Sequence, residues 1–178
     1  MNERLLHNVR LECLQGDIAN QSDMDAVVNA ANAELRIGGG VAGALHRAAG
    51  PGLEAECRPL APIRPGQAVI TGAHNLPNRY VIHCLGPIFG VDEPSDELLA
   101  ACYRNALSLA QEHGIASVAF PAISTGAFGY PLEAATEVAL TTMNSMLAQL
   151  SAVRHIRFVL HDATSRRLYE RMLESLPG

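Results

Sequence analysis

Short apolar runs alternate along this chain with longer segments in which apolar residues recur every three or four positions. Nearly continuous apolar runs that are bounded by Gly, Asn and Pro are typical of strands covered on both faces of a sheet. The pattern predicts six strands: Val9–Leu14, Ala26–Asn29, Ala68–Thr71, Tyr80–Leu85, Ser117–Pro121 and Ile156–Leu160.

The longer segments predict helices. They cover Val41–Ala49, Glu97–His113, Pro131–Leu150 and Ser165–Leu176. In the third, Ala135, Ala139 and Met143 fall on one stripe, and Pro131 suits a first turn, where a missing N–H costs nothing. Strands that alternate with helices predict one α/β domain, with a parallel or mixed sheet between helices. The ligands of such sheets bind beyond the carboxyl ends of the strands.

Composition narrows the function classes. The 178 residues are 48% hydrophobic and 17% charged, as in a globular domain, and the net charge is −5. A negative domain lacks the electrostatic attraction to DNA phosphates or acidic membranes, so a DNA-binding role is disfavoured. All 13 basic residues are arginines, which excludes a P-loop lysine and a Schiff-base lysine.

The cysteines and histidines show no metal spacing, and no metal site is expected. The four cysteines form no CxxC pair, so we interpret them as reduced core residues rather than as disulfides or metal ligands. The first ten residues are charged and do not resemble a signal peptide, and the apolar stretches are too short to span a membrane. We therefore expect a cytoplasmic protein that makes no membrane contact.

Four stretches follow predicted strands and could bind a ligand. The first is Gly16-Asp17-Ile18, where the carboxylate of Asp17 could accept from an exocyclic amine while the N–H of Ile18 donates to a ring nitrogen. The alternative is that Asp17 caps a turn or a helix start.

The second stretch is a glycine run that opens a helix. Asn29 and Asn32 end a strand, and Ile37–His46 follows with three consecutive glycines. Glycines let the backbone approach a ligand closely, and the free N–H groups of a helix start favour an anion. This predicts a phosphate cradle that needs no lysine; the alternative is a flexible loop before an amphipathic helix.

The third and fourth stretches lie later in the chain. Pro121–Pro131 could form a second anion cradle that faces the first. Within it, Phe128 could pack on a sugar face or plug the core. His161 leaves the last strand where its ring could stack on a planar base, or it is a surface or capping residue. For His46, the sequence leaves open whether its role is structural or catalytic.

Motifs argue against two other kinds of site. There is no GxSxG nucleophile elbow. A Rossmann dinucleotide site is also disfavoured, because the GxGxxG fingerprint and its acidic ribose partner are incomplete.

Taken together, the four stretches resemble the macrodomain family over nearly the whole chain. The motifs occur in family order: Gly16-Asp17-Ile18, Asn29-Ala-Ala-Asn32, Gly38-Gly-Gly-Val-Ala-Gly-Ala-Leu-His46, Tyr80-Val-Ile-His83 with Gly86-Pro87, and Pro121-Ala-Ile-Ser-Thr-Gly-Ala-Phe-Gly-Tyr-Pro131. The resemblance is greatest to MacroD-type enzymes. It implies a single macrodomain over residues 1–178, a three-layer α/β/α sandwich with a mixed sheet of about six strands. It also implies that the chain removes ADP-ribose from acidic protein side chains, deacetylates O-acetyl-ADP-ribose, or does both.

The resemblance also implies roles for single residues. Asp17 would hold the adenine amino group beside the Ile18 N–H, and His161 would lie on the adenine face. Asn32 would bond the distal ribose. The pyrophosphate would lie between two loops, which comprise Gly39, Gly40, Val41, Ala42 and Gly43 in one and Ser124, Thr125, Gly126, Ala127 and Phe128 in the other. Phe128 would also pack beside the distal sugar.

The departure from the MacroD pattern is at Ala42. Those enzymes usually have Asp there, and that acid is assigned to the attacking water. Without it, we expect the ligand's own phosphate and the glycine backbone to hold the water, with Asn32 and His46 as the candidate catalytic residues. The alternative is a reader that binds ADP-ribose without turnover. The expected partners are ADP-ribose, ADP-ribosylated proteins and O-acetyl-ADP-ribose; no cofactor is expected, and the chain is expected to be a monomer.

Overall fold

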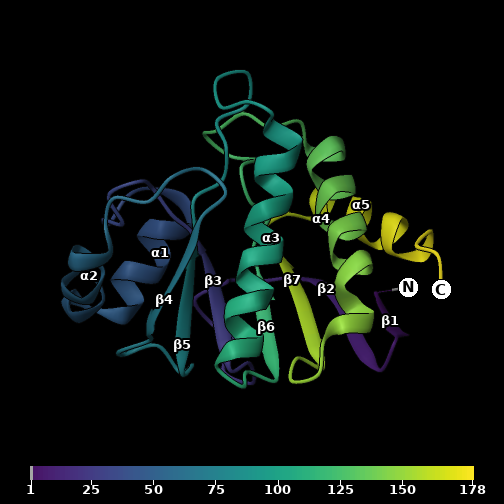
Figure 1. Cartoon of the computed structure of the whole chain (residues 1–178), viewed down its shortest axis with the longest axis horizontal. Coiled ribbons are helices and arrows are strands. Elements are labelled where there is room, and N and C mark those ends of the chain that lie inside the picture. The colour runs from purple at the N-terminus through teal and green to yellow at the C-terminus, as the bar shows by residue number, and fades with distance from the viewer. Residues whose placement is uncertain (1) are drawn as a thin grey trace.

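The fold is a mixed sheet between two layers of helices, seen in a computed structural model that describes residues 2–178 (Figure 1). The strands are β1 (Glu3–Leu6), β2 (Val9–Gln15), β3 (Ala26–Ala30), β4 (Ala68–Gly72), β5 (Tyr80–Cys84), β6 (Ser117–Phe120) and β7 (His155–Leu160). The helices are α1 (Gly40–Ala49), α2 (Pro51–Cys57), α3 (Ser95–Glu112), α4 (Leu132–Met146) and α5 (Ala163–Glu174), with 3₁₀ turns at Arg58–Leu60 and Leu147–Gln149.

The sheet order is β1-β2-β7-β6-β3-β5-β4. The five inner strands are parallel, whereas β1 and β4 pair antiparallel at the two edges. The carboxyl ends of all five parallel strands therefore meet along one edge, the upper edge in Figure 1. The predicted α/β/α architecture is confirmed.

The sheet has seven strands, not the six expected, because β1 was not predicted. It is a four-residue edge strand that carries two charges, so its pattern is weak. His7 and Asn8, with φ angles of 50° and 62°, turn it back onto β2. Such a turn favours glycine, and none marks it in the sequence.

Helix α2 was also not predicted, since Pro51 and Gly52 are typical of a loop. Pro51 instead occupies the first turn, where its missing N–H costs nothing. The helix predicted over Pro131–Leu150 ends in a 3₁₀ turn rather than continuing to Leu150. The last helix begins two residues earlier than expected, because Asp162 caps it by accepting from the Ser165 N–H at 2.7 Å.

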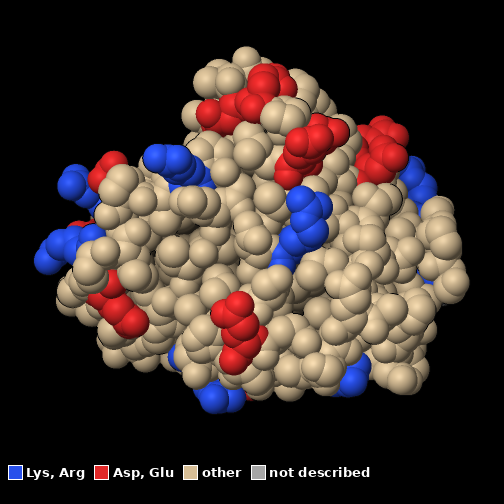
Figure 2. All heavy atoms as spheres, in the orientation of Figure 1, with Lys and Arg blue, Asp and Glu red and all other residues tan. Residues whose placement is uncertain are grey.

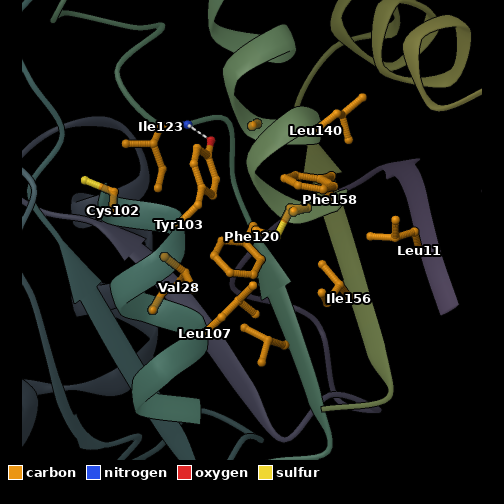
Figure 3. Close-up of a cluster of buried hydrophobic side chains, with 14 of the residues drawn as sticks. Leu11, Val28, Cys102, Tyr103, Leu107, Phe120, Ile123, Leu140, Ile156 and Phe158 are labelled. Atoms are coloured by element: carbon orange, nitrogen blue, oxygen red, sulfur yellow. Dashed lines mark hydrogen bonds between the residues drawn. The ribbon is translucent and has the colours of Figure 1, made fainter. Parts of the chain in front are cut away.

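Two apolar clusters hold the layers on the sheet. Helices α3, α4 and α5 cover one face with the larger cluster, in which Tyr103, Phe120 and Phe158 pack ring against ring (Figure 3). The smaller cluster lies under α1 and α2 on the other face. All four cysteines are buried and free, as predicted. Between residues 2 and 178, no helix has the length and apolar character needed to cross a membrane.

Candidate ligand-binding cleft

A cleft of about 740 Å³ lies along the carboxyl edge of the sheet. Its walls come from the segments that follow β2, β7, β6, β3 and β5, in the order in which these strands lie side by side. Asp17 and Ile18 therefore lie at one end, with His161 next to them, and Asn32 and Gly86 belong to strands toward the other end. The volume is within the range of small-molecule sites.

One wall is the start of α1. Its N-cap is Gly39, no side chain caps the helix, and no acidic residue lies in the first turn. The N–H of Gly43 is bonded to the Gly39 carbonyl at 3.1 Å, whereas the preceding amides of a helix have no acceptor within it. The predicted residues Gly39, Gly40, Val41 and Ala42 all line the cleft. This helix start is therefore arranged to bind an anion.

The facing wall is the loop between β6 and α4, and all five predicted residues, Ser124, Thr125, Gly126, Ala127 and Phe128, line the cleft. Ser124 adopts a φ of 69°, and its Oγ donates to the Pro87 carbonyl at 2.8 Å. The Tyr130 N–H closes the loop on the Ser124 carbonyl at 2.9 Å. The loop is thus held by its own backbone and by the segment after β5.

The lining residues include no arginine, and their titratable side chains are Asp17 and His161. Asp17 is exposed, and its Oδ1 accepts from the Ala19 N–H at 2.9 Å, so the capping interpretation also holds. The His161 side chain is 89% exposed and its Nε2 lies 3.3 Å from Asp162 Oδ2. This end of the cleft therefore offers a carboxylate edge and an uncovered ring.

Asn32 lines the cleft and also closes the loop that leads to the glycines. Its Oδ1 accepts from the Arg36 N–H at 3.0 Å, and its Nδ2 donates to the Arg36 carbonyl at 2.8 Å. One Nδ2 hydrogen is left for a ligand. Phe128 is half-buried against the smaller apolar cluster as well as lining the cleft, so both roles considered for it are compatible with its position.

Two predicted site residues do not line the cleft. Gly43 instead lies against the glycine loop, since a Cβ on it would be 2.4 Å from the Gly38 carbonyl oxygen. His46 is only 4% exposed, on the buried side of α1, and its Nε2 has no hydrogen-bond partner among the described residues. Burial lowers the pKa of His46, although nearby Glu54 raises it. Successive residues of a helix point in different directions, so the glycine motif does not reveal which of its residues face the cleft.

A buried polar network beneath the cleft was missed from the sequence. The Nδ1 of His83 accepts from the Asn29 amide at 3.0 Å, and its Nε2 lies 3.0 Å from Thr71 Oγ1. The Thr71 hydroxyl donates to the Gly72 carbonyl, so His83 Nε2 carries the proton of a neutral ring. Burial, with a smaller contribution from His46, lowers the pKa of His83 to about 3. The network joins β3, β5 and β4 just before β3 enters the cleft.

Gly86 was quoted as part of a motif but not predicted as a site residue. A Cβ on Gly86 would lie 2.1 Å from Ser124 Oγ and 2.6 Å from Ile123 Cγ2. The chain after β5 therefore presses directly on the loop after β6. A lone glycine before a proline gives little indication of such a contact.

Comparison with known proteins identifies the family. The model of the Macro domain family matches residues 28–139. An O-acetyl-ADP-ribose deacetylase of Citrobacter rodentium is 46% identical over 171 residues, which cover 93% of this chain and 96% of that protein. A solved macrodomain of Oceanobacillus iheyensis with ADP superposes with a TM-score of 0.93 at 36% identity, covering 97% of this chain and 94% of that one. A Trypanosoma brucei macrodomain in complex with ADP-ribose gives a TM-score of 0.86 at 36% identity, covering 92% and 68%.

Gly86→Ala should weaken ADP-ribose binding about 10-fold or more, because the new methyl group displaces the Ser124 loop. Titration calorimetry measures the effect. The control is Gly72→Ala, where the nearest atom to a new Cβ is Glu56 Oε1 at an ordinary 3.5 Å. Equal affinities in Gly86→Ala and wild type would show that this contact does not shape the cleft.

His83 should make the fold less stable at mildly acidic pH. Its folded pKa of about 3 lies below the ordinary histidine value of about 6.5, so the unfolded chain binds more protons between these values and stability falls as pH drops. His83 should contribute about 1.4 kcal/mol to the fall in the free energy of unfolding in urea from pH 7.5 to pH 5.5. His7→Gln, at an exposed turn, should keep this difference, whereas His83→Asn should reduce it. His46, whose pKa burial also lowers, leaves a remainder of the same sign, so only an undiminished difference in His83→Asn contradicts the assignment to His83.

Proposed function

The chain belongs to the macro domain family, and we propose that it binds ADP-ribose in this cleft and hydrolyses esters at the distal ribose. The substrates would be O-acetyl-ADP-ribose and acidic protein side chains that carry one ADP-ribose. One observation supports this most directly: two loops that offer backbone N–H groups line one cleft whose wall includes no arginine.

The order of the strands orients the ligand. Asp17, Ile18 and His161 follow β2 and β7, so the adenine would lie there. The diphosphate would lie between the start of α1 and the Ser124–Phe128 loop, which approach it from two sides. The distal ribose would then reach Asn32, and Phe128 would cover one of its faces.

Ester hydrolysis at this ribose needs a water that attacks the acyl carbon. The resulting tetrahedral intermediate expels the ribose hydroxyl, and the products are ADP-ribose and a carboxylic acid. Ala42 offers no carboxylate to this water, so the substrate's diphosphate and the glycine backbone would hold it. Asn32 would fix the sugar, and such positioning can supply several kcal/mol. We assign no proton transfer to His46, because it does not line the cleft.

The second candidate function is a reader of ADP-ribose without turnover, and Ala42 favours it. Both functions need the same binding cleft, so affinity does not separate them. Tight binding of ADP-ribose, combined with no release of product from O-acetyl-ADP-ribose or automodified protein over hours, would identify a reader.

Asn32→Ala should lower the rate of ADP-ribose release from automodified protein about 10-fold or more at saturating substrate, because the sugar is no longer fixed. Asn32→Asp keeps an acceptor for the Arg36 N–H but replaces the donor with a charged carboxylate oxygen, so it should slow hydrolysis too. Arg36→Ala is the control, since the contacts of Asn32 are to the backbone of that residue. Equal rates in wild type and Asn32→Ala would remove Asn32 from the mechanism.

The affinity for ADP-ribose should depend only weakly on salt. Peptide N–H groups rather than arginine side chains would hold the diphosphate, so calorimetry should show less than about a 3-fold change in Kd between about 0.05 and 0.5 M NaCl. A steep loss of affinity would indicate that cationic side chains contribute and would contradict the backbone cradle.

A further inference from the structure

The loop between β5 and α3 exposes apolar side chains beside the cleft. Ile88 is 40% exposed, Phe89 46% and Val91 70%. Ile37, on the loop that leads to the glycines, is 51% exposed. We refer to Ile37, Ile88, Phe89 and Val91 as the distal rim. Among the described residues, the other strongly exposed large hydrophobics are Leu5 and Leu60, which lie on other elements.

This exposure is built into an ordered loop. The Ile88 N–H donates to Asp92 Oδ2 at 2.8 Å, and the Ile88 carbonyl accepts from the N–H groups of Val91 and Asp92 at 3.0 and 2.9 Å. The Phe89 ring packs on Tyr130 with centroids 4.9 Å apart. The loop is therefore closed on itself and holds its apolar side chains in the open, so ordering them on binding costs little entropy.

The distal rim lies at the end of the cleft where the distal ribose would be. The Phe89 N–H donates to the carbonyl of Phe128, which lines the cleft, at 2.9 Å. Ile37 directly precedes Gly38, another lining residue. In the sheet, β5 lies beyond β3 on the side away from β2 and β7. A group attached to the distal ribose would therefore emerge toward this rim.

Acidic side chains adjoin the rim. Asp92 and Glu93 follow Val91 in the loop, and Asp96 and Glu97 lie in the first turn of α3. Figure 2 shows acidic side chains gathered at the top of the molecule, where Figure 1 places this loop and the start of α3. Two of these carboxylates, Asp96 and Glu93, add to the effect of burial in raising the pKa of Tyr130, the ring on which Phe89 packs. On the side formed by the loop between β5 and α3, the surface thus combines apolar contact area with negative charge.

We infer that the distal rim docks the polypeptide that carries the ADP-ribose, and that it favours apolar and basic side chains next to the modified residue. This inference rests on the proposed function. Negative charge on the loop attracts basic side chains, and Val91 and Phe89 offer contact area that an acetyl group is too small to use. The rim would therefore act on a modified protein and not on O-acetyl-ADP-ribose.

The test compares two substrates in one set of variants. One substrate is O-acetyl-ADP-ribose; the other is a peptide in which one ADP-ribosylated glutamate is flanked by leucine and arginine. Val91→Ser should raise the KM for the peptide about 5-fold, since an exposed valine loses its apolar contact, and it should leave O-acetyl-ADP-ribose hydrolysis unchanged. Leu5→Ser is the matched control, because Leu5 is 71% exposed on edge strand β1 and should affect neither substrate.

A second arm tests charge. Replacing the peptide's arginine with glutamate should raise its KM at low salt, and this difference should shrink at high salt as the charges are screened. If the chain is a reader, calorimetry compares the affinities of the same variants for ADP-ribose and for the modified peptide.

The outcomes separate the two ideas. If wild type neither binds nor hydrolyses either ligand, the proposed function fails. If wild type uses both substrates, the docking inference alone fails in either of two cases. Val91→Ser could change the hydrolysis of both substrates equally, or it could change neither, as expected of Leu5→Ser. Sedimentation that shows a dimer in wild type and a monomer in Val91→Ser would also overturn it, since the rim would then join two copies of this chain.

Discussion

A diphosphate that is held by peptide N–H groups, as proposed for this cleft, requires backbone at the ligand with no side chain in between. The two loops that supply these groups follow neighbouring strands, β3 and β6, so the parallel sheet brings them together. Because many residues of these loops are glycine or alanine, the loops have few side-chain contacts of their own, and their shape depends on the segments packed against them. Much of the structure around the cleft can be understood as support for two stretches of backbone.

That support consists of close contacts. Gly43 lets the first turn of α1 approach the Gly38 carbonyl, and Gly86 lets the segment after β5 press on Ser124. Beneath them, neutral His83 joins Asn29 of β3 to Thr71 of β4. A charged His83 could not accept from Asn29, so the network holds the strand end in place only while the ring stays neutral. In the proposed function, these residues would act on the ligand only through the backbone that they position.

Most of the fold could be predicted from the sequence, because the inner strands and the long helices bury continuous or periodic apolar faces. The elements that escaped prediction, β1 and α2, carry weaker signals: β1 has a turn without glycine, and α2 begins with a Pro-Gly pair that is typical of a loop. The cleft could be predicted as loops but not as individual contacts. Gly43 and His46 belong to the glycine motif yet do not line the cleft. The sequence did not predict this, because a motif does not show which face of α1 is buried against the sheet.

The ionisable side chains of the cleft lie at one end only, away from the place where the proposed hydrolysis would occur. The ionisable lining residues, Asp17 and His161, lie where the adenine would bind, whereas the end with Asn32 and Ala42 offers backbone and one amide. An acid at position 42 would activate water but would also repel the diphosphate beside it. With alanine there, the proposed diphosphate would avoid that repulsion, and the rate would depend on how well the water and the ester are positioned. A reader and a slow hydrolase then share one ground-state complex and differ only in barrier height, at about 1.4 kcal/mol for each factor of ten in rate.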